Sequence, residues 1–150
     1  MKIWLNIGLI FLTINTSAQH LNPVSWNFSA KKLSSGVYEI SMAASIQKGW
    51  HLYSQKQPID AIAIPTTFNI NKNPLLLLKG KIKEQGVLEK FEDVKLGLSA
   101  FQYSEKVNFV QQVTVRGKAK TNFSGTVEFQ PCDDKKCLPP KTIAFNIALK

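Results

Sequence analysis

Hydrophobic and polar residues alternate along several segments of the chain, as they do in β-strands that bury one face. In residues 37–46, the apolar side chains that would share one face are Tyr38, Ile40, Met42, Ala44 and Ile46. The same alternation continues in residues 107–115, 127–129 and 143–149, and it is weaker in residues 27–30, 50–54 and 66–70. Each of these segments is predicted to be a strand, with Gln111 interrupting the apolar face of its own segment.

Turn-forming residues lie between the predicted strands. Clusters rich in Gly, Pro, Ser and Asn occur at residues 34–36, 48–49, 57–58, 71–74 and 80. Residues 83–91 come nearest to a helical pattern, and Gly86 disfavours a helix there. Several short, half-buried strands with turns between them predict one all-β domain, an antiparallel β-sandwich.

Residues 89–105 fit the alternating pattern least well. Aromatic side chains such as Phe91 and Phe101 are mixed with charged ones at irregular spacing. Long irregular loops on a sandwich often carry function, but the pattern alone favours a surface crossover between the two sheets. We therefore predict a loop in this segment.

The first residues have the layout of a secretory signal peptide. A basic start at Lys2 precedes an apolar run at residues 3–12, and small residues end at Ala18. The apolar run is about half of the ~20 residues that a membrane-spanning helix needs. We predict a signal peptide at residues 1–18, cleavage after Ala18, and an exported mature domain at residues 19–150.

Composition and charge narrow the class of protein. Hydrophobic residues make up 44% and charged residues 19%, which is typical of a globular domain. The formal net charge is +9, but the lysines are spread along the chain. An exported protein also seldom meets nucleic acid, so we interpret this charge as a solvated surface and expect no nucleic-acid partner.

Two cysteines, Cys132 and Cys137, lie on either side of four polar residues between two predicted strands. A loop of this length is common in β-hairpins. Opposed residues of an antiparallel pair have Cα atoms ~4.5–5.5 Å apart, within the ~4.4–6.8 Å range of disulfides. A disulfide is therefore feasible if the two residues face each other, and export would allow it to persist.

Several uses of this cysteine pair remain open, and thiol–disulfide exchange is favoured over a structural bond. The short ring would stabilise the fold by only ~2 kcal/mol, whereas a loop tip is accessible to another protein. A metal site would need more ligands, and the only histidines are His20 and His51. Cysteine-protease chemistry would require His51 beside a cysteine.

The residues around the cysteines have opposing effects. Lysines at 135, 136 and 141 would stabilise a thiolate, and the aspartates at 133 and 134 would oppose it. Pro139 and Pro140 cannot donate ladder hydrogen bonds, so the chain after the site could offer its backbone to a partner or be protected against aggregation.

Residues 131–141, Pro-Cys-Asp-Asp-Lys-Lys-Cys-Leu-Pro-Pro-Lys, resemble the active-site hairpin of the N-terminal periplasmic domain of thiol:disulfide interchange protein DsbD. That family has two cysteines around a short polar loop, followed by one residue and Pro-Pro. Residues 48–53, Lys-Gly-Trp-His-Leu-Tyr, resemble its Gly-aromatic-aromatic-Leu-Tyr strand, and residues 103–113 resemble the strand after its cap loop. The resemblance covers most of the predicted mature chain.

The resemblance implies an immunoglobulin-like sandwich in the periplasm that passes reducing equivalents between thioredoxin-fold proteins without a metal or organic cofactor. Cys137 would form the mixed disulfide with the partner, and Cys132 would resolve it. Tyr53 matches a tyrosine that packs beside the cysteines, and Phe91 is the candidate for the phenylalanine of the cap loop that shields them. His51 stands where the family more often has an aromatic residue.

Two features depart from the family pattern. Four residues separate the cysteines, where the best-known members have five. The full family protein also carries a membrane domain and a C-terminal thioredoxin-like domain, which this sequence lacks, so a separate membrane electron donor is expected.

The prediction is thus a protein-disulfide reductase or interchange component. The alternative is a non-catalytic secreted β-sandwich binding module with a structural disulfide, which a reduction potential well below about −300 mV would favour. Trp26 and Trp50 could line a sugar site, but aromatic residues on strands more often belong to the core.

Overall fold

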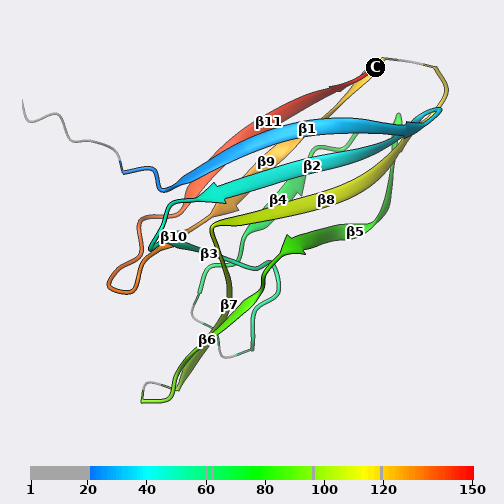
Figure 1. Cartoon of the computed structure of the whole chain (residues 1–150). Helices are drawn as coiled ribbons and strands as arrows, with labels where there is room; N and C mark the ends of the chain where they lie inside the picture. The colour runs from blue at the N-terminus through cyan, green and yellow to red at the C-terminus, as the bar shows by residue number, and fades with distance from the viewer. Residues whose placement is uncertain (1–20, 60, 62, 96, 119) are drawn as a thin grey trace, which may run out of the picture.

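The computed structural model describes residues 21–150 except 60, 62, 96 and 119, so the predicted signal peptide lies outside the described residues. In this part of the chain the regular elements are all strands, paired antiparallel (Figure 1). They are β1 (Val24–Ser34), β2 (Val37–Ile46), β3 (His51–Tyr53), β4 (Thr67–Ile70), β5 (Leu76–Gly86), β6 (Glu89–Asp93), β7 (Leu98–Ser104), β8 (Lys106–Val115), β9 (Thr121–Phe129), β10 (Pro131–Cys132) and β11 (Lys141–Leu149). Among the described residues, no helix has the length and hydropathy to cross a membrane.

Two of the three sheets form the body of the sandwich. Sheet A has the strand order β1-β2-β8-β5, and sheet C has the order β11-β9-β4. Aromatic rings join their facing sides: Phe109 of β8 lies 5.0 Å from Phe68 of β4, between ring centroids, and Trp26 of β1 lies 5.3 Å from Phe129 of β9. Burying rings of this size supplies most of the driving force for packing the sheets.

The alternation in the sequence is confirmed in the body. All five apolar residues predicted to share a face of β2 are buried, and the last strand buries Phe145, Ile147 and Leu149. Gln111 is also buried, and its side-chain amide donates hydrogen bonds to the backbone carbonyls of Lys79 and Gln112. The polar interruption is therefore satisfied where the pairing of β5 with β8 shifts register between Lys79 and Lys83.

Sheet B is smaller and has the strand order β10-β3-β7-β6. The prediction of a loop at residues 89–105 is wrong, because β6 and β7 form a hairpin that extends away from the body (Figure 1). The central residues of β6 are exposed on both faces, so pairing with β7, rather than burial of one face, holds this strand in place. For that reason its sequence shows no alternation.

Candidate functional site

The segment that carries the cysteines changes sheets. The β9–β11 ladder ends at the pair Phe129 and Lys141. After Gln130 the chain enters β10, where Pro131 pairs with Leu52 and Cys132 pairs with His51 of β3. The first cysteine is thus built into sheet B, whereas the sequence suggested that both cysteines end the strands of one hairpin.

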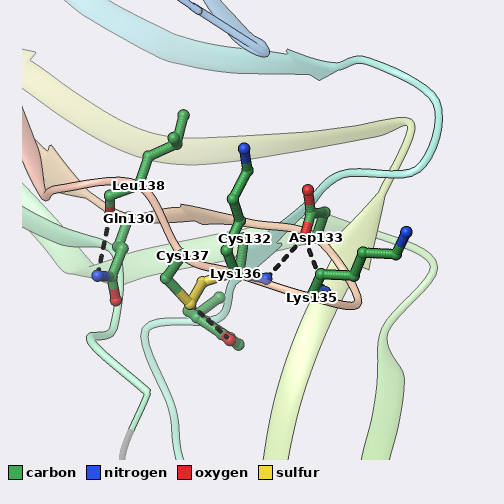
Figure 2. The surroundings of a disulfide bond; sticks show 8 residues. Gln130, Cys132, Asp133, Lys135, Lys136, Cys137 and Leu138 are labelled. Atoms are coloured by element: carbon green, nitrogen blue, oxygen red, sulfur yellow. Dashed lines mark hydrogen bonds between the residues drawn. A yellow bond between two sulfur atoms is a disulfide. The ribbon is translucent and has the colours of Figure 1, made fainter.

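The loop between the cysteines closes through its own hydrogen bonds (Figure 2). The Asp133 carboxylate accepts hydrogen bonds from the backbone N–H groups of Lys135, at 2.8 Å, and Lys136, at 2.7 Å. These bonds are the main reason that the pKa of Asp133 lies below its usual value. The Asp133 N–H donates to the Lys136 carbonyl, and the Leu138 N–H donates to the Pro131 carbonyl. The turn is therefore organised by Asp133, which the sequence suggested as part of a polar, turn-prone run and as a charge opposing the thiolate.

Cys132 and Cys137 face each other and form a disulfide, with their Cα atoms 4.0 Å apart (Figure 2). The sequence-based expectation that the two residues can be bridged is confirmed, although their Cα atoms lie closer together than the ~4.4 Å lower end of the expected range. Their exposure differs sharply: Cys132 is 1% exposed, whereas Cys137 is exposed to solvent. Only one cysteine of the pair thus lies at the surface.

Tyr53 lies beside the exposed cysteine. Its hydroxyl oxygen is 3.9 Å from the Cys137 sulfur, and because a disulfide sulfur has no hydrogen, the hydroxyl is the donor. Burial raises the pKa of Tyr53, so the phenol keeps its proton at neutral pH. The hydroxyl can therefore donate equally to a Cys137 thiolate.

His51 lies two residues before Tyr53 on the same face of β3, and their rings meet edge to face with centroids 5.5 Å apart. Burial lowers the pKa of His51, while Asp134, Asp133 and Glu89 act in the opposite direction. The imidazole is therefore mainly neutral at pH 7. The structure thus brings His51 and Tyr53 to the two cysteines.

The remaining predicted residues lie farther out. Pro139 and Pro140 are exposed directly after the disulfide loop, between the Cys132–Cys137 bridge and β11. Phe91 lies in the middle of β6 with 48% of its surface exposed. β6 is three strands from β10, and at ~4.8 Å per strand the backbones of these two strands lie on the order of 14 Å apart. The Lys141 ammonium contacts the Leu21 carbonyl and the Asn22 side chain.

The sequence did not single out two polar residues of this sheet, Ser104 and Glu89. Ser104 of β7 pairs with His51, and its hydroxyl donates to the Glu89 carboxylate of β6 at 3.0 Å. Both lie in the segment predicted to be a loop, and only the strand register places them beside the site. Among the residues that the structure describes, no cluster of three or more His, Cys, Asp or Glu is placed to hold a metal ion.

Comparison with protein families gives one match over nearly the whole chain. The family model described as "Thiol:disulfide interchange protein DsbD, N-terminal" matches residues 18–149. A comparison with curated proteins gave no match.

Solved structures of two such proteins share the fold. The N-terminal periplasmic domain of ScsB from Proteus mirabilis is 15% identical, with a TM-score of 0.61 over 90% of this chain and 48% of that chain, so this chain spans about half of the ScsB length. The reduced N-terminal domain of DsbD from Neisseria meningitidis is 16% identical, with a TM-score of 0.55 over 84% of this chain and 85% of that chain. A complex of that DsbD domain with the N-terminal domain of PilB gives 15% identity and a TM-score of 0.52 over 85% and 87% of the two chains. The similarities confirm the immunoglobulin-like sandwich fold.

Proposed function

Because this chain belongs to the family of N-terminal domains of the thiol:disulfide interchange protein DsbD, we propose that it passes reducing equivalents between thioredoxin-fold proteins through Cys132 and Cys137. One observation carries the proposal: the disulfide joins an exposed cysteine to a buried one at a loop tip. An exposed sulfur can be attacked by a partner thiolate or can attack a partner disulfide. A buried sulfur reacts only within its own chain.

This asymmetry assigns a step to each cysteine. In the reduced protein, the Cys137 thiolate attacks a partner disulfide, forms a mixed disulfide and releases one partner thiolate. Cys132 then attacks the Cys137 sulfur, which forms the Cys132–Cys137 bond and releases the second partner thiolate. The partner gains two electrons and takes up two protons in all, and the domain loses two electrons and two protons. A reduced thioredoxin-like donor reverses both steps.

Tyr53, Pro139 and Pro140 support this exchange. The Tyr53 hydroxyl stabilises the Cys137 thiolate by donating to its sulfur. The prolines have no backbone N–H, so the exposed segment between Cys137 and β11 stays outside the β9–β11 ladder and can lie along a partner. Shielding by Phe91 would require the β6–β7 hairpin to bend toward the cysteines, and the half-exposed ring is available for such a movement.

The compartment and the partners form part of the proposal. The related ScsB structure is described as a periplasmic domain, and residues 1–18 are proposed to direct export to the same compartment, where a disulfide can persist. The neisserial DsbD domain binds the N-terminal domain of PilB in its complex. For this chain we propose thioredoxin-fold partners and electrons supplied by a separate membrane protein.

Trapping tests this proposal. The reduced Cys132→Ser variant, mixed with oxidised thioredoxin as a test partner, should accumulate a mixed disulfide that dithiothreitol dissolves. The Cys137→Ser variant should form none, although it retains one thiol and serves as the matched control. Equal trapping by both variants, or a reduction potential of the pair well below about −300 mV, would indicate a structural bond instead.

A further inference from the structure

A polar row crosses one face of sheet B at the level of the disulfide. Cys132 of β10 pairs with His51 of β3, and His51 pairs with Ser104 of β7. Opposed residues of an antiparallel pair point to the same face with Cβ atoms about 4.5–5.5 Å apart. Glu89 of β6 extends the row by accepting a hydrogen bond from the Ser104 hydroxyl at 3.0 Å. The order across the sheet is thus cysteine, histidine, serine and glutamate.

The buried cysteine needs a proton acceptor in the resolving step. Only a thiolate attacks a disulfide, and burial opposes formation of a thiolate. Cys132 is 1% exposed, so bulk water is a poor acceptor for its proton. Tyr53 is unsuited to this role, because burial raises its pKa and it holds its proton. His51 is the titratable side chain directly opposite Cys132.

Resting on the proposed function, we propose that His51 accepts the proton of the Cys132 thiol when Cys132 attacks the mixed disulfide on Cys137. The proton moves from the Cys132 sulfur to the imidazole, the new bond forms between the two cysteines, and the electron pair of the broken bond leaves with the partner thiolate. The imidazolium then gives its proton to that thiolate or to water. In the reverse direction, the imidazolium returns a proton to Cys132 as the disulfide opens.

The charges around His51 suit this cycle. Burial keeps the imidazole neutral before the step, so it can accept a proton. Three carboxylates then stabilise the imidazolium: Asp133 and Asp134 of the cysteine loop and Glu89 of β6. The loop also carries Lys135 and Lys136, both exposed. On β7 the neutral Ser104 lies opposite His51 and the neutral Gln102 lies opposite Tyr53, which adds a neutral phenol on β3.

The two steps can be timed separately with 5,5′-dithiobis(2-nitrobenzoic acid) and the reduced full mature chain. Attack by Cys137 releases one coloured thiolate at a rate proportional to reagent concentration. Attack by Cys132 releases the second at a rate independent of it. An ordinary thiol with a pKa of about 8.5 is only about 3% ionised at pH 7. His51→Gln should therefore slow the second phase at pH 7 by about tenfold or more.

The pH profile separates proton acceptance from a structural role. The wild-type second phase should be nearly flat from pH 7 to 8.5 and should fall below the pKa of His51. In His51→Gln it should rise by about 15-fold in total over the same range, as the ionised fraction of an unassisted thiol with a pKa of about 8.5 does. Glu89→Gln should move the acid limb of the wild-type profile to lower pH, because it removes a carboxylate that raises the pKa of His51.

Matched variants complete the test. Tyr53→Phe, on the same strand but beside Cys137, should slow the first phase rather than the second. Cys132→Ser should abolish the second phase, and circular dichroism should show that each variant is folded. If the His51→Gln profile runs parallel to that of the wild type, His51 is not the proton acceptor, although the exchange function stands. If the wild-type protein shows no second phase, the exchange function itself fails.

Discussion

The body of the sandwich and sheet B both consist of antiparallel strands, but they use their faces differently. Sheets A and C bury large rings such as Phe109, Phe123 and Phe129 between them, and each of these is 0% exposed. Sheet B also gives one face to the core, through Leu52 and Tyr103. Its other face carries the cysteines and the polar row beside them. The comparison indicates that stability resides mainly in the body and reactivity in sheet B.

One carboxylate connects the two regions. Glu84 of β5, in sheet A, accepts hydrogen bonds from Tyr103 of β7, from Ser54, and from the backbone N–H of Gln55 just after β3. Burial and the bond to Glu84 both raise the pKa of Tyr103, so its hydroxyl remains a donor. Glu84 therefore holds the strands of the site against the body.

The largest expected effect is in the body. Phe109→Ala removes a fully buried ring from the contact between the two sheets and should lower the free energy of unfolding by about 3–5 kcal/mol. Urea denaturation measures this, with Phe109→Leu as a milder control. The folded variant should still release both thiolates from the reagent described above at wild-type rates. If the folded variant loses its exchange activity, reactivity depends on the body as well as on sheet B.

The second largest effect is expected at Glu84, which connects the body to sheet B. Glu84→Ala removes the carboxylate that accepts hydrogen bonds from the buried hydroxyls of Ser54 and Tyr103 and should cost about 2–3 kcal/mol. In a Tyr103→Phe background the same change should cost less, because one of those hydroxyls is already absent. Unlike Phe109→Ala, Glu84→Ala should also alter the second phase of exchange. If it changes stability alone, Glu84 does not position the site.

The disulfide itself should contribute less than either. Its ring spans a sequence separation of five residues, so loop entropy limits its stabilisation to about 2 kcal/mol. The neighbouring β9–β11 ladder already restrains the same turn. Urea denaturation of the oxidised and reduced wild-type protein measures the difference. If reduction lowers the free energy of unfolding by much more than about 2 kcal/mol, the disulfide also stabilises the body.

Most strands of the body could be predicted from sequence because they bury one face and expose the other. β2 shows this clearly, and its observed bounds, Val37–Ile46, are those predicted. The alternation fails for β5 and β6, which are largely exposed on both faces. Neither strand was predicted, because a strand with both faces exposed lacks the alternation of hydrophobic and polar residues that would distinguish it from a loop.

The site could be predicted only as far as its residues are local in sequence. The spacing of Cys132 and Cys137 indicated that they could be bridged, and the resemblance pointed to Tyr53 and His51. Ser104 and Glu89 could not be identified, because their place beside His51 depends on the register of β3 with β7 and of β7 with β6. The difference in exposure between the two cysteines likewise arises from the transfer of β10 to sheet B.

A smaller effect should appear in the pH dependence of stability. The folded-state pKa of His51 lies below its usual 6.5, so below that pH the unfolded chain binds more protons than the folded one. The contribution of His51 should therefore be fully present above about pH 6.5 and lost as the pH falls toward the folded-state pKa. His51→Gln should remove this slope between pH 5 and 7 in urea denaturation. A difference curve of opposite sign would show that the site stabilises the imidazolium instead.

The smallest effect is expected at Phe91, the residue of sheet B that the resemblance suggested as a cap over the cysteines. This residue is 48% exposed and lies three strands from the disulfide strand. Phe91→Ala should therefore change stability by no more than about 0.5 kcal/mol, and reduction of the disulfide by dithiothreitol by no more than about twofold. Val94→Ala, at the exposed end of the same hairpin, is the matched control. If Phe91→Ala alone accelerates reduction severalfold, the hairpin bends over the cysteines in solution and sheet B carries its own shield.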